Sequence, residues 1–287
     1  MAERPEGSKP PAVPTQSPAQ KTGARGEPAH LVVERVERRF DDFVALSGID
    51  LTIARGDIAV IIGGSGAGKT TLLKLLIALD KPTSGAIRLG GVDMTKLDER
   101  ELNQFRRKLG MVFQYSALLD SMNVLDNVAF PLREHTKLKE KEIHAKVIDK
   151  LKALGLENIE QRFPSELSGG MRKRVGLARA LMLEPEVILY DEPTSGLDPI
   201  TSRMVDDMIL ETRDNFGVTS VVISHDMAGA LRIADEIHLL SKGRLVASGA
   251  PRKLVESNQE LVHKFLESSG IAADRLLDER DQASAQH

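Results

Sequence analysis

The fold of this chain is decided by the stretch Gly63-Gly64-Ser65-Gly66-Ala67-Gly68-Lys69-Thr70, which fits the P-loop pattern G-x-x-x-x-G-K-[S/T] at every fixed position. An apolar run, Ile58 to Ile62, precedes it, and a helical pattern, Thr70 to Leu79, follows it. The glycines therefore stand between a buried strand and a helix N-terminus, where backbone N–H groups and the helix dipole favour a polyphosphate. We expect Lys69 to reach the β- and γ-phosphates of a nucleoside triphosphate and Thr70 to bind Mg²⁺. The alternative, a glycine-rich turn without a ligand, is disfavoured by the strand and helix on either side.

Composition limits what else the chain can be. Its 287 residues, 41% of them apolar and 28% charged, favour one sizeable α/β domain with smaller appendages. A net charge of −3 offers no general attraction to nucleic acid or acidic lipid. The absence of cysteine excludes disulfides and thiolate metal sites and suits a reducing compartment. No apolar run approaches the roughly 18 residues of a membrane span, so we expect neither a channel nor a permease.

The ends of the chain differ in composition from its middle. Residues 1–30 contain six of the thirteen prolines and no apolar core of a signal peptide, so we expect a disordered tail and a cytoplasmic protein. The nucleotide-binding domain is expected over residues 31–267, with a helical subdomain inserted at about 98–180. After Leu254 an amphipathic helix is expected to carry Leu261, Val262, Phe265 and Leu266 on its apolar face, and residues 268–287 read as a polar tail.

Hydrophobic periodicity predicts the elements around the P-loop. Leu31–Phe40, Ile49–Ile53 and Ala86–Leu89 are predicted strands, separated by turn signals. The ring of Phe40 either stacks on an adenine or belongs to the core. From Asp98 to Leu156 the pattern is helical and charged, and one helix face is predicted to carry Ile143, Val147, Leu151 and Leu154.

Two further strands end in polar residues. The run Val187–Glu192 is an apolar strand that ends in two carboxylates, the Walker B arrangement. Because successive side chains at a strand end point in different directions, we expect Asp191 to hold Mg²⁺ and Glu192 to act as the base for hydrolysis. The run Thr219–Ile223 is followed by His225, which is either a structural hydrogen-bonding residue or a contact of the γ-phosphate.

Residues 167–171 read Leu-Ser-Gly-Gly-Met, and a basic, helical run follows them. With this motif in place, the sequence resembles the ATP-binding cassette (ABC) ATPases over roughly Leu31 to Leu266. The resemblance makes Gln114 the Q-loop glutamine, Ser195-Gly196-Leu197-Asp198 the D-loop and His225 the switch histidine. It implies an α/β fold: a RecA-like P-loop NTPase core with an antiparallel β subdomain and an inserted α-helical subdomain.

The same resemblance implies a site that two chains share. Ser168 is expected to cap a helix whose free N–H groups form a second anion site. In the family, each ATP lies between the P-loop of one subunit and the signature of the other, so we expect a homodimer with two equivalent sites. The expected ATP-binding residues are Phe40, Gly63, Gly64, Ser65, Gly66, Ala67, Gly68, Lys69, Thr70, Thr71, Ser168, Gly169, Gly170 and Asp198. The expected Mg²⁺ ligands are Thr70, Gln114 and Asp191, and the expected catalytic residues are Glu192, His225, Gln114 and Lys69.

Finer features bear on what the ATPase drives. The stretch Phe113–Leu132 and the run that starts at Leu167 resemble the ATPases of Mce-type phospholipid transporters, which include the bacterial system that maintains outer-membrane lipid asymmetry (Mla). Met171 stands where most transport cassettes have glutamine; this removes a side-chain amide but spares the Ser168 hydroxyl. The resemblance implies an ATPase on the cytoplasmic face of the inner membrane, attached through a permease and working with an MCE-domain lipid-binding protein and a small regulatory subunit.

The permease is expected to dock near Gln114. There the apolar residues Ala117, Leu118 and Leu119 are either core or the lining of a docking groove.

Other functions stay open at this point. The ATPase of an importer for polar amino acids or other small solutes would share every catalytic motif. DNA-repair clamps and translation factors also use this cassette, but their long coiled coils or paired cassettes are absent here, where roughly 100 residues separate Lys69 from Ser168. A nucleotide-binding scaffold would normally lack the base, and Glu192 is present.

Overall fold

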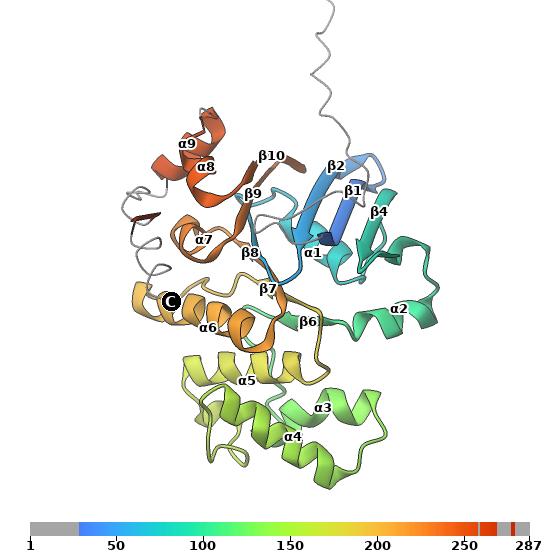
Figure 1. The fold of residues 1–287 in the computed structure, drawn as a ribbon, viewed down its shortest axis with the longest axis vertical. Coiled ribbons are helices and arrows are strands. Elements are labelled where there is room, and N and C mark those ends of the chain that lie inside the picture. The colour runs from blue at the N-terminus through green and yellow to red at the C-terminus, as the bar shows by residue number, and fades with distance from the viewer. Residues whose placement is uncertain (1–28, 258, 269–276, 279–287) are drawn as a thin grey trace, which may run out of the picture.

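The chain folds into two β-sheets with a lobe of helices beside them (Figure 1), in a computed structural model that describes residues 29–257, 259–268 and 277–278. Residues 1–28 of the expected N-terminal tail, and all of the expected C-terminal tail but 268 and 277–278, lie outside the described residues. The tail was expected to reach residue 30, but β1 already begins at Ala29.

The strands that lead to the predicted phosphate-binding motifs lie in the larger sheet. Its six strands follow the order β10-β9-β3-β8-β7-β6. The strands β3, β6, β7, β8 and β9 run parallel, and β10 pairs antiparallel with β9. Their bounds are β3 Ile58–Ile62, β6 Leu109–Val112, β7 Val187–Asp191, β8 Thr219–Ser224, β9 Glu236–Ser241 and β10 Arg244–Gly249.

The smaller sheet is antiparallel and has the order β2-β1-β4-β5. It consists of β1 Ala29–Phe40, β2 Phe43–Ala54, β4 Ser84–Leu89 and β5 Val92–Asp93. The predicted strands Leu31–Phe40, Ile49–Ile53 and Ala86–Leu89 all lie within these elements. The hairpin between β1 and β2 extends further than predicted, because its tip, with Phe43 and Val44, is exposed and carries no buried apolar run.

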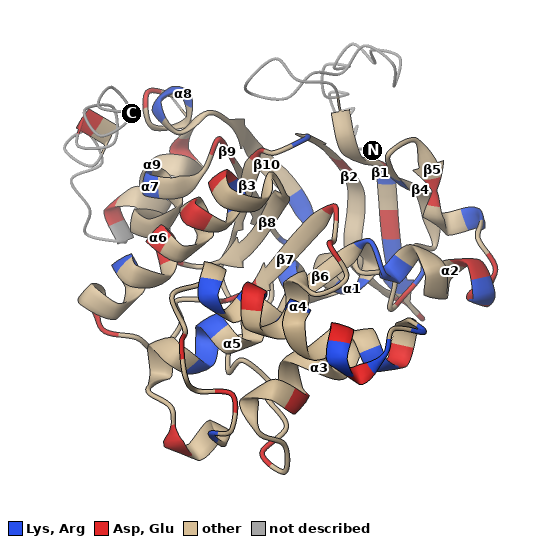
Figure 2. Ribbon diagram, turned by 60° about the horizontal axis from the view of Figure 1, so that its bottom comes forward, with Lys and Arg blue, Asp and Glu red and all other residues tan. Residues whose placement is uncertain are grey.

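Helices cover both faces of the larger sheet and form the separate lobe. They are α1 Lys69–Leu76, α2 Glu99–Arg106, α3 Val124–His135, α4 Glu140–Ala153, α5 Gly169–Leu181, α6 Pro199–Phe216, α7 Met227–Ile233, α8 Pro251–Val255 and α9 Glu260–Ser268, with short 3-10 turns η2 Met94–Lys96 and η3 Pro164–Glu166. Acidic and basic residues are interspersed over these helices (Figure 2), in keeping with a net charge of −3.

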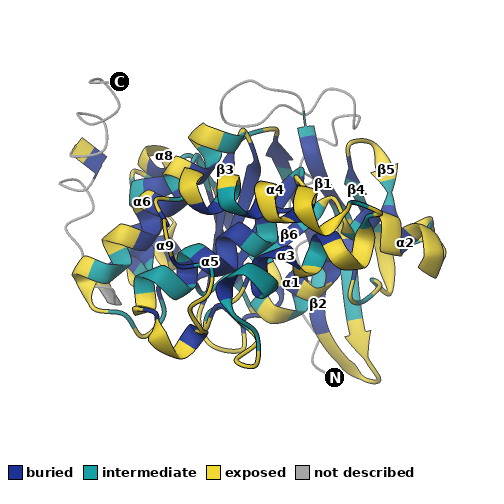
Figure 3. Cartoon of the chain, turned by 90° about the horizontal axis from the view of Figure 1, so that it is seen from below, coloured by how far each residue is buried: buried dark blue, intermediate teal, exposed yellow. Residues whose placement is uncertain are grey.

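The larger sheet is buried on both faces, and this explains its continuous apolar runs (Figure 3). In β3, Ala59 and Ile61 belong to the apolar cluster that also holds α1 and the smaller sheet. Ile58, Val60 and Ile62 point the other way, into the cluster formed with α6 and α7. Both faces of the strand that leads to the P-loop are therefore fixed by packing.

The helical lobe has an apolar cluster of its own. Residues of α3, α4 and α5 form it, and α4 contributes Ile143, Val147 and Leu151, as its periodicity predicted. The start of the lobe differs from the expected residue 98. Leu102 and Phe105 of α2 are buried in the cluster of the smaller sheet, and β6 pairs with β7. The sequence after residue 98 has a helical, charged pattern because it holds α2 and only a four-residue strand, β6. Both elements pack against the core and not against the lobe.

The C-terminal helix packs as its pattern indicates. Val262 and Leu266 of α9 are buried against the cluster that contains α6, while Leu261 is exposed. Within the stretch expected to be a polar tail, Leu277 is buried in the same cluster. Across the described part of the chain, no helix combines the length and the apolar character needed to traverse a bilayer.

Candidate functional site: a phosphate loop and its catalytic neighbours

The P-loop joins β3 to α1, as the sequence predicted. Gly68 precedes the first helical residue with a φ of 107°, a backbone conformation that disfavours other residues. A Cβ atom at Gly63 would lie 2.4 Å from the main-chain oxygen of Leu240, so the loop passes too close to β9 for a side chain. Gly64, Ser65, Gly66 and Thr70 are exposed around the loop. This cradle of backbone amides at a helix N-terminus suits a polyphosphate.

Three predicted catalytic residues meet at one edge of the larger sheet. Nζ of Lys69 donates to the carbonyl oxygen of Gly63 at 2.7 Å and lies 3.4 Å from Oε1 of Glu192. The other oxygen of Glu192, Oε2, is 2.7 Å from Nδ1 of His225 and accepts the backbone N–H of the same histidine at 3.2 Å. Because an ionised carboxylate only accepts hydrogen bonds, Nδ1 is the donor of this contact in the forms of His225 that carry a proton there.

The two acids of β7 stand in different surroundings. Asp191 ends the strand and is half-buried; burial and the neighbouring charge of Glu192 raise the pKa of its carboxyl, and Lys69 opposes that rise. Glu192 follows with a φ of 46°, which is strained for a residue with a side chain. Its backbone N–H donates to the carbonyl of Ile223 in β8 at 2.8 Å, which helps hold this conformation.

Gln114 lies beyond β6, on the far side of β7. Its Nε2 donates to the hydroxyl of Tyr115 at 3.3 Å. The hydrogen bonds and ion pairs of the described residues thus join Lys69, Glu192 and His225 but leave the Gln114 side chain outside that group. Its expected place among the metal ligands stays a prediction.

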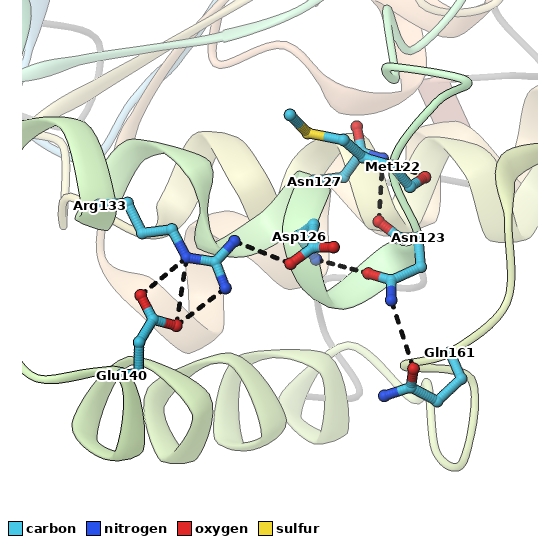
Figure 4. A network of polar contacts seen from close by, with 7 residues as sticks. All are labelled: Met122, Asn123, Asp126, Asn127, Arg133, Glu140 and Gln161. Atoms are coloured by element: carbon cyan, nitrogen blue, oxygen red, sulfur yellow. Dashed lines mark hydrogen bonds and ion pairs between the residues drawn. The ribbon is translucent and has the colours of Figure 1, made fainter.

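A buried asparagine of α3 holds the segment after Gln114, and a surface ion-pair network joins α3 to α4; Figure 4 shows part of both. Nδ2 of Asn127 donates to the carbonyls of Leu119, Met122 and Asn123, each at 3.0 Å. Along the same helix, Arg133 pairs with Asp126 at 2.8 Å and with Glu140 of α4 at 2.9 Å. The sequence left residues 117–119 as either core or the lining of a docking groove. In the structure Leu118 packs on the lobe cluster, whereas Ala117 and Leu119 are exposed.

The signature residues begin a helix in the lobe. Oγ of Ser168 accepts the N–H of Met171 at 3.3 Å, so Ser168 is the N-cap of α5, as predicted. Gly169 and Gly170 form its first turn, and Met171 packs against the lobe cluster. Figure 1 shows α5 in the lower lobe and α1 among the sheets above it.

Asp198 caps α6 rather than facing the P-loop of its own chain. Its carboxylate accepts the N–H groups of Ile200 and Thr201, both at 3.0 Å, and the hydroxyl of Thr201 at 2.5 Å. These hydrogen bonds, that from the Thr201 hydroxyl first, lower the pKa of Asp198. Its predicted contact with ATP stays a prediction.

Phe40 is exposed at the end of β1, which favours the binding role over the core role. Its ring is 45% exposed, and the guanidinium of Arg38 lies 4.5 Å from the ring centroid. Arg38 is itself held by Asp80 at 2.9 Å. An aromatic ring that keeps exposed surface suits stacking on a purine.

Comparison with known proteins shows the family of this chain. Residues 46–195 match the family described as ABC transporter. The chain belongs to this family. The matched residues run from β2 to the loop after Glu192 and thus contain the P-loop, the Q-loop, the signature and the Walker B strand of the cassette.

Two curated relatives that match this chain are named for different transport systems. An ATP-binding protein of Escherichia coli K12, MlaF of the intermembrane phospholipid transport system, is 44% identical over 78% of this chain and 82% of its own length. The protein mkl of Mycobacterium tuberculosis H37Rv, named a probable ribonucleotide transport ATP-binding protein, is 42% identical over 82% of this chain. The match spans 66% of that relative's length.

Solved ABC cassettes share the fold. The cbiO1 protein of Clostridium perfringens, part of the ABC transporter complex cbiONQ, superposes with a TM-score of 0.74 at 32% identity, over 83% of this chain and 94% of its own. A dimeric cassette in a post-hydrolysis state with ADP and phosphate gives a TM-score of 0.68 at 32% identity, over 77% of this chain and 98% of its own. The predicted fold class, a P-loop core with an antiparallel β subdomain and a helical insert, is confirmed.

The sequence analysis did not single out two cationic residues of α5, the signature helix of this ABC cassette. Lys173 is buried, and it donates to the carbonyls of Gln114 and Pro193. Arg179 donates to the carbonyls of Ser116 and Ala117 at 3.0 and 2.8 Å. The available signal was the position of Lys173 on the apolar stripe of α5, four residues before Leu177.

Proposed function

We propose that this chain is the ATP-hydrolysing subunit of an ABC transporter. The observation that carries the proposal is the position of the Glu192 carboxylate, which contacts both Lys69 of the P-loop and His225. An acid next to a P-loop can accept the proton of a water that attacks the γ-phosphate, as P-loop NTPases and kinases require of their water- or hydroxyl-orienting residue. Family membership and the dimeric structural neighbour support this reading.

The residues present fit ATP with Mg²⁺. The P-loop offers outward-facing amides and an ammonium group, and Thr70 is exposed at the start of α1. The proposed metal ligands Thr70, Gln114 and Asp191 include one carboxylate, which suits Mg²⁺ because this ion usually keeps waters and substrate phosphates in its shell. Bound there, Mg²⁺ would neutralise charge on the β- and γ-phosphates.

The remaining roles belong to side chains of this protein. Lys69 is placed to hold the β- and γ-phosphates, and Glu192 to orient and deprotonate water. His225 restrains the carboxylate through Nδ1. Phe40 is proposed to stack on the adenine.

We further propose that the active unit is a homodimer with two composite sites. Ser168, Gly169 and Gly170 begin a helix that lies apart from the P-loop of the same chain (Figure 1). A second copy, placed head to tail, can present these amides and Asp198 to the nucleotide. The structural neighbour described as a dimer with ADP and phosphate supports this arrangement.

Phospholipid movement between membranes is the proposed task. The relatives named for intermembrane phospholipid transport match at 42 to 44% identity over about four-fifths of this chain. We propose that the cassette sits on the cytoplasmic face of the inner membrane, docked through the surface beside Gln114 to a permease that works with an MCE-domain protein. A second candidate, ribonucleotide transport, is favoured by the name of the mycobacterial relative.

Hydrolysis is tested with the purified full-length chain. ATP turnover is measured with Mg²⁺ and with excess chelator, beside Lys69→Ala, which removes the P-loop ammonium. We expect Mg²⁺-dependent turnover in the wild type alone. Wild-type activity that persists in Lys69→Ala would contradict the proposed site.

The transported substrate is tested by purifying the chain from its native membranes in mild detergent and identifying both proteins and lipids by mass spectrometry. Recovery of a multispanning permease, an MCE-domain protein and phospholipid supports lipid transport. Recovery of a permease with a soluble solute-binding protein supports import of a nucleotide or other small solute instead. Recovery of no membrane protein contradicts both transport proposals.

A further inference from the structure

A buried lysine of the signature helix joins two loops of the candidate site. Lys173 lies in the second turn of α5 and is only 8% exposed. Burial lowers the pKa of its ammonium group. Among the described residues, both acceptors recorded for its Nζ are main-chain carbonyls, and no carboxylate lies within ion-pair distance. Burying an ammonium group costs free energy unless it is hydrogen-bonded, and here the two carbonyls are the acceptors that offset this cost.

The first acceptor is in the loop after the base. Nζ of Lys173 lies 2.5 Å from the carbonyl oxygen of Pro193, which directly follows Glu192. Glu192 has the strained φ of 46°, and its N–H is held by Ile223 of β8. The peptide before the strained residue is thus tied to the sheet, and the Pro193–Thr194 peptide, one residue further along, is tied to α5. A strained backbone persists only where its surroundings hold it, and here two hydrogen bonds from different elements do so.

The second acceptor is in the Q-loop. Nζ of Lys173 lies 3.3 Å from the carbonyl oxygen of Gln114. The same face of α5 continues along this segment: a Cβ atom at Gly176 would lie 3.2 Å from the carbonyl oxygen of Ser116, and Arg179 holds the carbonyls of Ser116 and Ala117. The latter two residues have φ values of 62° and 44°. The Q-loop exit is therefore a strained turn fastened to the signature helix.

We propose that Lys173 is a positioning residue that sets the Glu192 loop and the Q-loop in register with the signature helix. Within the residues that the structure describes, its hydrogen bonds reach neither the P-loop nor Phe40, so we expect it to act on the chemical step and not on nucleotide affinity. When α5 shifts against the sheet, the carbonyls of Gln114 and Pro193 are displaced together. The inference rests on the proposed ATPase function, and the test below separates the two.

The test uses two variants of the full-length chain and one matched control. Lys173→Met keeps the length and apolar stem but removes every donor, and Lys173→Gln keeps two N–H donors for the two carbonyls. Lys150→Met is the control, because Lys150 is a second lysine whose pKa burial lowers, and it packs over Phe216 of α6 at 4.5 Å, away from both loops.

We expect Lys173→Met to lower kcat for ATP hydrolysis about 10- to 100-fold, because small misplacements of a catalytic group have effects of this size. The KM for ATP should stay within about twofold of the wild type, since uniform binding is untouched. Lys173→Gln should recover most of the lost kcat, and Lys150→Met should behave as the wild type. A Lys173→Met enzyme with wild-type kcat, or one that Lys173→Gln does not improve, overturns the proposal.

Hydrogen–deuterium exchange on the same proteins supplies a readout that does not depend on hydrolysis. Lys173→Met should raise exchange in the peptides that cover residues 114–117 and 193–197, and Lys150→Met should not. Wild-type protein without ATPase activity would contradict the proposed function, whereas exchange would still decide whether Lys173 holds the two loops. Unchanged exchange in both peptides overturns the positioning role.

Discussion

Oε2 of Glu192 lies 2.7 Å from Nδ1 of His225, although 33 residues separate the two in the chain. The contact follows from strand order, because β3, β8 and β7 are neighbours in a parallel sheet and their carboxyl ends meet at one edge. Lys69 begins the helix that follows β3, and Glu192 and His225 follow β7 and β8, so residues far apart in the sequence meet at this edge.

Replacing the base separates nucleotide binding from hydrolysis. In Glu192→Gln the side chain keeps its size but cannot accept the proton of water, so we expect turnover to fall about 10²- to 10⁴-fold while ATP still binds. An ATP-bound dimer should then accumulate, seen by size-exclusion chromatography with ATP. Glu157→Gln, an exposed change in a loop of the lobe, is the control. Wild-type turnover in Glu192→Gln would remove the role assigned to this acid.

Mixing two inactive variants tests the composite site. Lys69→Ala disables the P-loop, and Ser168→Arg blocks the N-terminus of α5, so each homodimer should be inactive. In a heterodimer one site combines both defects and the other is intact, so an equimolar mixture should regain up to about a quarter of the wild-type rate. ATPase assays after subunit exchange measure this. If heterodimers form and the rate stays at zero, the two motifs do not share a nucleotide.

Two adjacent glycines of the P-loop should differ in what they tolerate. Gly63→Ala brings a Cβ atom within 2.4 Å of the Leu240 carbonyl oxygen, so it should destabilise the fold by about 1 to 3 kcal/mol. Gly64→Ala meets no atom within 4 Å and should leave stability nearly unchanged. Urea unfolding of both variants measures the difference. Equal stabilities would mean that the loop is further from β9 than described.

A buried carboxylate outside the proposed catalytic residues should make stability depend on pH. Burial, opposed by Arg232 at 2.7 Å, raises the pKa of Asp206 in α6 to about 6, above its unfolded value of about 3.9. Between these values the native state holds more protons than the unfolded state, so the free energy of unfolding falls as pH rises.

The size of this effect follows from the shift of about two pKa units, which corresponds to about 2 to 3 kcal/mol lost between pH 4 and pH 7. Asp206→Asn carries no titrating proton, so that part of the pH dependence should disappear. Urea unfolding at pH 4.5 and pH 7 for the two proteins isolates it, because other groups contribute equally to both. Identical pH dependences would show that Asp206 titrates normally.

Local pattern predicted most of the fold. The strands β3, β7 and β8 are short continuous apolar runs that end in polar motifs, and such runs are typical of a parallel sheet buried on both faces. The helix α4 shows its buried face through a clear 3.6-residue period. Ser168 was placed at a helix start because serine before glycines and a periodic run is a capping signal.

What the sequence could not predict depends on contacts between distant segments. The strand β6 is four residues long and has no period of its own, so only its pairing with β7 reveals it. Ser116 and Ala117 adopt positive φ values although neither is a glycine, so the sequence does not mark this turn. The turn is held by Arg179, which lies 62 residues further along the chain than Ala117. The contact between His225 and Glu192 required the order of β7 and β8.

The apolar clusters also bear on how the molecule can move. Helices α3 and α4 bury their side chains in the lobe cluster, whereas α5 is shared: Val175 and Ala178 face the lobe, and Leu177 and Leu181 face the larger sheet. A rotation of the lobe as one body would therefore keep the packing of α3 on α4 and would have to change the contacts that α5 makes with the sheet. Because α5 belongs to both packing units, it is the element through which a rearrangement at the edge of the sheet would be transmitted to the lobe.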